Sequence, residues 1–588
     1  MARYGSIGRR PPLEVSMDGL MMDYPLTIAH LFERVGRYFP DREIVTRRPD
    51  KSIHRTTYRD FSRRVQQLAN ALLRLGVKPG DRVATLGWNG WRHLEAYFAV
   101  PLTGAVLHTL NPRLSSQDLG YIVNHAGDRF LLVDDVLVPV WARFRDEVHL
   151  EQVIVWGDVG QAPPGVIDYE ALIAPELPSF AIPRLEEGQA LGICYTSGTT
   201  GRPKGVVYSH RAVVLHSLAS ALPDSLGLSA QDVVMPVVPM FHVNAWGLPF
   251  TAVMTGAKQV FPGPHLDPAS LLGLVAAERV TVTAGVPTIW LGLLEALDRD
   301  PGAFDTSSLR AMVVGGAAAP RAMIEAFEKR HRLQVIHAWG MTETTPIGAV
   351  SRLKPGLENF PEEHRYRLRA TQGIPPPFVE VRAVGEEGTP VPWDGATMGE
   401  LHVRGPWVAR SYFQNPSEAD KFTMDGWFRT GDVVTIDVEG YVRITDRAKD
   451  LIKSGGEWIS SVDLENALMG HPAVKEAAVV GVPHPRWGER PVACVVPKAG
   501  AVVTPRELGE FLEPLFARFW LPDAFVFLEQ IPRTAAGKFL KSALREQLKG
   551  LPLDGGAAAG ASPRGGAAGA EGRAPGGGAA GARRPGPG

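Results

Sequence analysis

Short apolar runs rich in β-branched residues alternate with helix-period segments from about Thr27 to Asp450. The runs RVATLGW and FLLVDDV are typical of buried strands, and FSRRVQQLANALLRLG is typical of an amphipathic helix. Strands that alternate with helices form layered α/β structures. The pattern therefore predicts an α/β fold, with a large N-terminal domain of several layers and mixed sheets.

A second folded unit follows this region. The stretch from Arg447 to Lys549 contains the strand-like runs EAAVVGVP and PVACVVP and the helix-like segments ELGEFLEPLFARF and FLKSALREQLK. This content suffices for a small, mobile α+β domain of about 100 residues, and a chain of 588 residues exceeds what one core organises. We place the boundary in DRAKD, Asp446 to Asp450. The predicted divisions are residues 1–446, residues 447–550 and a tail, residues 551–588.

The composition bears on the tail, the partners and the location of the protein. The tail offers almost no apolar side chain larger than Ala, so it cannot offset the entropy of folding, and we predict that it is disordered. Since 62 Lys and Arg residues balance 63 Asp and Glu residues, the charge indicates no nucleic-acid or membrane-surface partner. Two cysteines in apolar stretches, Cys194 and Cys494, predict reduced thiols and a cytoplasmic location. No apolar run is long enough for a bilayer, so we predict no membrane span.

The stretch YTSGTTGRPKGV, Tyr195 to Val206, has the residue types of a phosphate-binding loop. A Walker-type loop leads directly into a helix. In this chain a strand-like run, VVY, follows Lys204 and Gly205, which predicts a loop between two strands and a helix from near Ser209. Backbone N–H groups and hydroxyls would then bind phosphate, and glycines would permit close approach. An ordinary Gly-rich hairpin is the alternative interpretation.

Several other stretches occur together with this motif. They are PMFHVNAWG (239–247), VVGGAAAP (313–320), HAWGMTETTP (337–346), GWFRTGD (426–432), DRAKDLIKSGGEWIS (446–460) and PRTAAGK (532–538). Their order and approximate spacing resemble those of the adenylate-forming superfamily of acyl-CoA synthetases, luciferases and peptide-synthetase adenylation domains. The resemblance covers about residues 25–548 and is strongest to bacterial medium- and long-chain fatty-acyl-CoA ligases. It implies the adenylate-forming enzyme fold, with a C-terminal lid that moves.

The resemblance also implies a reaction and its substrates. ATP and a fatty acid would form an acyl adenylate and pyrophosphate, and coenzyme A would then take the acyl group and release AMP. Lys538 would reach the α-phosphate, and Thr196 and Glu343 would hold Mg²⁺. Trp339 would stack on adenine, and Asp432 would bind the ribose. The nucleotide and coenzyme A residues implied are Thr196, Ser197, Gly198, Thr199, Thr200, Lys204, Trp246, Gly315, Gly316, Ala317, His337, Ala338, Trp339, Thr342, Asp432, Arg447, Lys449, Lys453 and Trp458. Lys449 matches the hinge position of the family.

The acid would bind beside PMFHVNAWG and AGVPTIW, which offer apolar walls and small residues. Relatives that activate amino acids have an aspartate after the phenylalanine, and this chain has His242 there. A buried ammonium would lack a partner, which argues for an uncharged acyl chain. The residues predicted to contact the acid are His242, Val243, Trp246, Gly247 and Gly285. Trp246 would line or close the acyl channel, with simple core packing as the alternative.

Three other functions stay open at this stage. The first is a CoA ligase for aryl or short branched acids, and the second is a ligase that transfers the acyl group from AMP to a carrier protein. The third is an inactive acyl-nucleotide sensor, which the joint presence of Glu343, Asp432, Arg447 and Lys538 disfavours. A homodimer is a further expectation, because relatives are often dimers.

Overall fold

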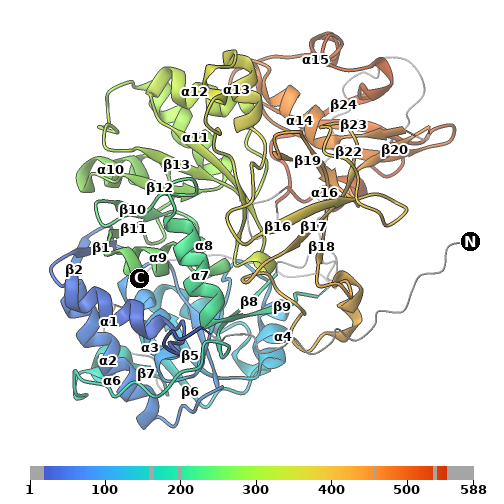
Figure 1. The fold of residues 1–588 in the computed structure, drawn as a ribbon. Helices are drawn as coiled ribbons and strands as arrows, with labels where there is room; N and C mark the ends of the chain where they lie inside the picture. Colours follow the sequence, from blue (N-terminus) through green and yellow to red (C-terminus); the bar gives the residue numbers. More distant parts are fainter. Residues whose placement is uncertain (1–18, 158–164, 197–201, 456, 534–538, 552–588) are drawn as a thin grey trace, which may run out of the picture.

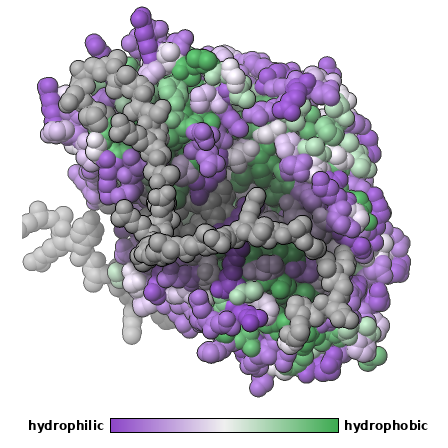
Figure 2. Space-filling model, turned by 180° about the vertical axis from the view of Figure 1, so that it is seen from behind, coloured by the Kyte–Doolittle hydropathy of each residue, from purple (hydrophilic) through white to green (hydrophobic). Residues whose placement is uncertain are grey.

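The computed structural model describes residues 19–157, 165–196, 202–455, 457–533 and 539–551. Four β-sheets form the framework, and helices cover the two largest (Figure 1). The surface is hollowed across the middle of one face, where both hydrophilic and hydrophobic residues are seen (Figure 2). The predicted α/β fold with a small C-terminal α+β unit is confirmed.

The first large sheet has eight strands in the order β15-β14-β13-β12-β10-β11-β1-β2. Its strands are β1 (Glu43–Arg47), β2 (Ile53–Thr57), β10 (Val233–Pro236), β11 (Lys258–Phe261), β12 (Val282–Gly285), β13 (Ala311–Val314), β14 (Val335–Gly340) and β15 (Ile347–Val350). The inner strands are parallel, and the edge strands β2 and β15 run antiparallel. Parallel strands need cover on both faces, which explains why these segments are nearly continuous apolar runs.

The second large sheet has seven strands in the order β7-β6-β5-β3-β4-β8-β9. Its strands are β3 (Arg82–Leu86), β4 (Val106–Thr109), β5 (Asp128–Asp134), β6 (Gln152–Trp156), β7 (Ile167–Asp168), β8 (Ala190–Tyr195) and β9 (Gly205–Ser209). Only β9 runs antiparallel to its neighbour, β8. The phosphate-type motif therefore begins at the end of a buried strand.

Helices pack on and between the two large sheets, and the last three helices in the chain belong to the C-terminal unit. They are α1 (Ile28–Tyr38), α2 (Tyr58–Arg74), α3 (Trp91–Leu102), α4 (Ser116–Ala126), α5 (Val138–Trp141), α6 (Tyr169–Ile173), α7 (His210–Ala221), α8 (Val243–Trp246), α9 (Leu248–Thr255), α10 (Pro268–Glu278), α11 (Pro287–Arg299), α12 (Arg321–His331), α13 (Glu362–Arg369), α14 (Ser461–Met469), α15 (Pro505–Leu512) and α16 (Lys541–Gln547). Helix α3 is buried along its whole length because it contacts strands of both large sheets. The two sheets thus share one helical layer.

Two smaller sheets complete the fold. An antiparallel sheet contains β16 (Glu380–Val384), β17 (Gly399–Arg404), β18 (Phe428–Ile436) and β19 (Val442–Arg447). A five-stranded sheet contains β20 (Ile452–Ser454), β21 (Glu457–Ile459), β22 (Val474–His484), β23 (Gly488–Pro497) and β24 (Ala524–Phe527). The chain passes from one sheet to the other at residues 448–451, between β19 and β20, which overlaps the end of the DRAKD stretch.

The C-terminal unit also contains one departure from expectation. The sequence predicts a helix from Glu507 towards Phe519, whereas α15 begins after Thr504 and ends at Leu512. Thr504 and Glu507 form a capping box, in which the Thr504 N–H donates to Glu507 Oε2 over 2.7 Å. Pro514 lacks the N–H that the next turn needs, so the helix stops before it.

Two expectations from composition can be compared with the structure. Cys194 and Cys494 are both buried free thiols. Among the described residues, no helix combines the length and the apolar character that crossing a bilayer requires.

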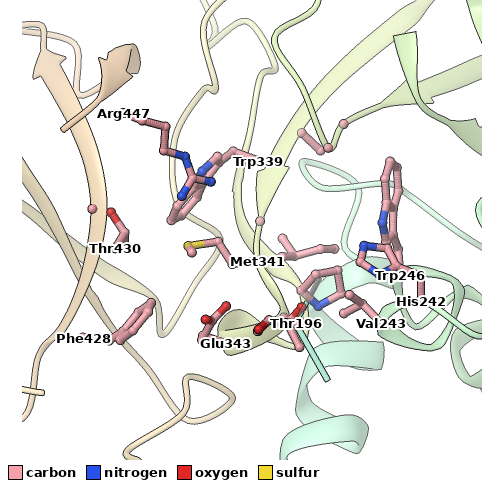
Figure 3. A pocket seen from close by; sticks show the side chains of 18 of the residues that line it. Thr196, His242, Val243, Trp246, Trp339, Met341, Glu343, Phe428, Thr430 and Arg447 are labelled. Atoms are coloured by element: carbon pink, nitrogen blue, oxygen red, sulfur yellow. The ribbon is translucent and has the colours of Figure 1, made fainter. Parts of the chain in front are cut away.

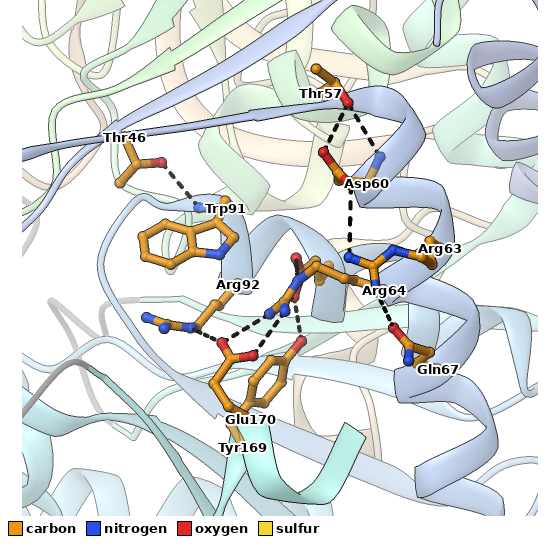
Figure 4. Close-up of polar contacts among 11 residues, drawn as sticks. Thr46, Thr57, Asp60, Arg63, Arg64, Gln67, Trp91, Arg92, Tyr169 and Glu170 are labelled. Carbon is orange, nitrogen blue, oxygen red and sulfur yellow. Dashed lines mark hydrogen bonds and ion pairs between the residues drawn. The ribbon is translucent and has the colours of Figure 1, made fainter. Parts of the chain in front are cut away.

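A buried ion-pair network joins the N-terminal helices (Figure 4). Glu95, only 1% exposed, pairs with Arg64 over 2.6 Å and accepts a hydrogen bond from the Tyr169 hydroxyl over 2.5 Å. Arg64 also pairs with Glu170 over 2.8 Å, and Glu170 pairs with Arg92 over 2.8 Å. A buried charge that loses its partner is strongly destabilising, so this network stabilises the packing of α2, α3 and α6 against one another.

We expect Arg64→Met to lower the free energy of unfolding by about 3–5 kcal/mol, because it leaves the Glu95 carboxylate buried without its cation. Burial raises the pKa of Glu95, and Arg64 opposes that shift. Losing Arg64 raises the pKa further, so the destabilisation should grow as the pH rises above about 4.3, the ordinary value for Glu. Urea unfolding at pH 5 and pH 8 measures this. The matched control is Arg59→Met on the same helix, which breaks an exposed pair with Asp41. Equal effects of the two substitutions would contradict the prediction.

Candidate active site

One pocket of about 530 Å³ lies where the two large sheets meet the four-stranded sheet (Figure 3). Its walls come from the end of β8, the segment after β14, strand β18 and the residues after β19. The volume is in the range of small-molecule sites. The pocket therefore collects segments that are far apart in the sequence.

The neck of the phosphate-type loop is closed by two hydrogen bonds. The Thr196 N–H donates to the Lys204 carbonyl over 2.9 Å, and the Lys204 N–H donates to Thr196 Oγ1 over 3.2 Å. The first of these bonds continues the antiparallel pairing of β8 and β9, and α7 begins at His210 with Ser209 as its cap. The expected placement of the motif between two strands is confirmed. Ser197, Gly198, Thr199 and Thr200, predicted to bind phosphate, lie outside the described residues.

Lys204 pairs with an acid at the pocket edge. Its Nζ lies 2.5 Å from Glu418 Oε2 and 5.2 Å from the centre of the Tyr412 ring. Both contacts hold a cation beside the pocket, where it would favour an anionic ligand.

Glu343 lies in a short 3₁₀ turn, Thr342–Thr344, directly after β14. It is 5% exposed, and the Tyr412 hydroxyl donates to its Oε1 over 2.6 Å. Burial, together with the neighbouring Glu343 carboxylate, raises the pKa of Tyr412 well above its ordinary value. The phenol therefore stays protonated and orients the carboxylate.

A buried carboxylate joins three walls of the pocket. Asp432, 1% exposed, accepts a hydrogen bond from Trp339 Nε1 over 3.1 Å and lies 2.6 Å from Arg447 Nε. Trp339 packs so closely on Gly348 that a Cβ at that glycine would come within 2.2 Å of the ring. The position of the indole is therefore set from two sides.

The PMFHVNAWG stretch forms a left-handed turn. Val243, Asn244, Ala245 and Trp246 have φ values of 45°, 51°, 50° and 57°. A residue other than glycine costs about 1–2 kcal/mol in this left-handed conformation, so tertiary contacts must hold the turn. The Trp246 ring lies over Gly315, where a Cβ would come within 3.0 Å of it. The sequence analysis predicted neither this contact nor the strained backbone.

The predicted site residues divide into groups. Those that line the pocket are Thr196, Lys204, His242, Val243, Trp246, Gly315, Gly316, Ala338, Trp339, Thr342, Glu343, Arg447 and Lys449. Described members of the set that do not line it are Gly247, Gly285, Ala317, His337, Asp432, Lys453 and Trp458. Lys538 lies outside the described residues.

Several of the residues away from the pocket have other partners. His337 is buried, which lowers its pKa to about 4, and its Nδ1 lies 3.1 Å from the Ala370 carbonyl. Gly285 lies behind Gly315, which donates its N–H to the Gly285 carbonyl over 3.3 Å. Lys453 Nζ lies 4.0 Å from the centre of the Trp458 ring, on paired strands of the five-stranded sheet.

Sequence reasoning also missed part of the lining. The additional residues include Leu226, Val313, Met341, Pro346, Ile347, Tyr412, Lys421, Phe428, Arg429, Thr430 and Phe539. Some had a signal, because Arg429 and Thr430 belong to GWFRTGD and Phe539 follows PRTAAGK. Tyr412 had none, since its role depends on a long-range contact with Glu343.

Two oxygen-bearing side chains in the pocket have the chemistry to hold a hard divalent cation. Thr196 and Glu343 both line the pocket (Figure 3). Within the described part of the chain, no group of three or more His, Cys, Asp or Glu side chains is placed to hold a metal. Mg²⁺ suits such a site, because it takes few protein ligands and completes its shell with water and phosphate.

Comparison with known proteins agrees with this geometry. The model of the family described as AMP-binding enzyme matches residues 32–413, and that of the AMP-binding enzyme C-terminal domain matches residues 463–538. The chain is 54% identical to a long-chain-fatty-acid–CoA ligase of Thermus thermophilus over 90% of its length and 97% of that protein. It is 45% identical to a 3-methylmercaptopropionyl-CoA ligase of Ruegeria lacuscaerulensis over 91% of its length and 99% of that protein.

A solved structure shows the same architecture. The crystal structure of the anthranilate CoA ligase AuaEII with anthranoyl-AMP superposes with a TM-score of 0.80 at 27% identity, covering 89% of this chain and 98% of that one. The two family models match residues in both folded parts, and the first includes the pocket residues Thr196, Trp339 and Glu343. The chain therefore belongs to the AMP-binding enzyme family and is an acyl-CoA ligase.

Proposed function

We propose that the protein is an ATP-dependent ligase that joins fatty acids to coenzyme A. The observation that carries the proposal is the apolar part of the pocket lining. The Trp246 ring lies beside Gly315 and Gly316, and the apolar side chains of the lining include Leu226, Val243, Val313 and Ile347. An uncharged hydrocarbon chain suits such walls, because apolar surface gains by leaving water.

The carboxylates of the pocket lining argue against an amino-acid substrate, because both already have partners. Among the described lining residues, the carboxylates are those of Glu343 and Asp450. Glu343 is oriented by Tyr412, and Asp450 pairs with Arg545 over 2.6 Å. A substrate ammonium would be buried near His242 without a partner, at a cost of several kcal/mol.

The reaction divides into two steps that share this pocket. In the first, a carboxylate oxygen of the acid attacks the α-phosphorus of ATP, and the bond to pyrophosphate breaks. In the second, the thiol of coenzyme A attacks the acyl carbon, loses its proton, and AMP leaves. The mixed anhydride makes AMP a good leaving group, which a free carboxylate lacks. Thr196 and Glu343 would hold Mg²⁺, which neutralises phosphate charge when bound.

The C-terminal unit would supply the cation for the first step. Phe539, the residue after Lys538, lines the pocket, so the chain reaches the site at that position. Lys449 also lines the pocket, and Arg545 donates to its carbonyl over 3.3 Å. We infer that Lys538 stabilises charge at the α-phosphate and that rotation near Lys449 then admits the thiol.

A panel of acids tests the substrate class. We expect acid-dependent ATP–pyrophosphate exchange and CoA consumption to be fastest with medium- and long-chain aliphatic acids, because apolar side chains are part of the pocket lining. Short branched, short thioether, benzoate-like and amino acids are the comparison set. Activity confined to aryl acids would overturn the proposal in favour of an aryl-CoA ligase. Accumulation of acyl-AMP with CoA present would point instead to a carrier-protein acceptor.

We expect Lys538→Ala to lose at least about 100-fold in pyrophosphate exchange, because the α-phosphate loses a preorganised cation. The variant should still convert supplied acyl-AMP and coenzyme A to thioester within a few-fold of the wild-type rate. The control Lys549→Ala removes an exposed lysine, 70% accessible, from the same region and should change neither step. Equal losses in both steps would refute the assignment.

We expect Glu343→Gln to raise the Mg²⁺ concentration for half-maximal activity at least about tenfold, because a hard cation prefers a carboxylate to an amide. Tyr412→Phe keeps the carboxylate and removes only its donor, so its effect should be smaller. Adenylation rates across a magnesium titration provide the measurement. An unchanged metal requirement in Glu343→Gln would show that this carboxylate does not hold the ion.

A further inference from the structure

The segment from Pro236 to Gly247 connects β10 to α9 and carries the acyl side of the pocket. Its first half is buried, with Val237 and Met240 fully inaccessible and Phe241 3% exposed. Backbone N–H and carbonyl groups that water cannot reach need partners within the protein. The segment has no regular structure between β10 and α8, so other elements must supply these partners.

The side chain of Asn89 supplies three of them. Its Nδ2 donates to the carbonyls of Pro236 and Val238, each over 2.9 Å, and its Oδ1 accepts from the Met240 N–H over 2.7 Å. The Tyr97 hydroxyl donates to the Met240 carbonyl. Asn89 is 4% exposed. One amide therefore uses both its donors and its acceptor on one segment.

These hydrogen bonds join different parts of the fold. Asn89 lies between β3 and α3, in the unit built on the seven-stranded sheet, whereas the segment it holds follows β10 of the eight-stranded sheet. The neighbouring Trp88 ring contacts the Phe241 ring edge-on, with centres 5.7 Å apart. These contacts therefore fix the position of the segment relative to the seven-stranded sheet.

The held segment leads directly into the left-handed turn. Met240 precedes Val243 by three residues, and Val243 to Trp246 have φ values between 45° and 57°. A β-branched residue in that region is an outlier that persists only where its surroundings fix it. On the far side, Gly247 packs against His216, where a Cβ would come within 2.7 Å of the ring. The turn is therefore held at both ends.

We propose that Asn89 is a positioning residue for the acid substrate. By fixing the backbone from Pro236 to Met240, it holds the strained turn so that His242 and Trp246 face the pocket. The nucleotide side is built on β8, β14 and β18, which Asn89 does not contact through its amide. The inference rests on the proposed function in one respect, because it takes the turn from Val243 to Trp246 as the wall that contacts the acyl chain.

We expect Asn89→Ala to raise KM for the acid at least about tenfold, because three hydrogen bonds to the segment are lost together. KM for ATP should stay within about twofold, because the nucleotide walls keep their contacts. The ratio of kcat/KM between a medium-chain and a long-chain acid should also change, since the wall moves. Steady-state kinetics with each substrate varied in turn measure all three quantities.

Two further variants test the same proposal if Asn89→Ala fails to fold. Asn89→Asp is isosteric and keeps the acceptor for Met240, but it places an oxygen against two carbonyls, so the same signature should appear. Tyr97→Phe removes a single hydroxyl and should raise KM for the acid a few-fold. The matched control is Asn70→Ala, since Asn70 also donates to two backbone carbonyls over 2.9 Å, those of Leu177 and Ser179. It should leave KM for both substrates unchanged.

A purely structural role for Asn89 would look different. The active fraction, measured from the burst of pyrophosphate, would fall while KM and acid selectivity stayed at wild-type values, and that result would overturn the proposal. Equal rises in KM for acid and ATP would overturn it as well. The kinetics use whichever acid the wild-type enzyme turns over, so failure of the fatty-acid proposal would appear in the wild-type panel alone.

Discussion

The arrangement of the pocket walls depends on the buried carboxylate of Asp432, which connects three of them. It belongs to β18, accepts from Trp339 at the end of β14, and pairs with Arg447 at the end of β19. Removing such a charge from water costs several kcal/mol, and the cost is offset only while both partners stay in place. The wall that carries the indole and the start of the passage to the C-terminal unit are therefore fixed by the same group.

Local chemistry explains why part of the site could be predicted from the sequence. The strand-like residues after Lys204 predict a loop between strands, and the structure has β9 there, with α7 starting at His210. The strand-like runs named from the sequence correspond to β3, β5, β22 and β23, and two of the helix-like segments correspond to α2 and α16. Where the prediction of a helix beyond Leu512 was wrong, the local reason was already in the sequence, because Pro514 cannot continue it.

The remainder depended on contacts between distant segments. Tyr412 orients Glu343 and Glu418 pairs with Lys204, and no local pattern marks either partner. The left-handed turn is a sharper example, because Val243 to Trp246 contain no glycine to indicate positive φ. Such a conformation follows from anchors elsewhere, here the Asn89 amide and the packing of Gly247 on His216. Strain of this kind is invisible to propensity and pattern.

That strain also explains why acyl-chain length is hard to derive from the sequence. The φ of Trp246 is fixed at 57° in an anchored turn, so its ring changes position by side-chain rotation rather than by backbone movement. The ring lies over Gly315, where a Cβ would come within 3.0 Å of it. If the proposed function holds, the orientation of the Trp246 ring against Gly315 and Gly316 would help to set which acid lengths fit. Residue types would then indicate the polarity of the acid, whereas its length would depend on a side-chain orientation that residue identity does not encode.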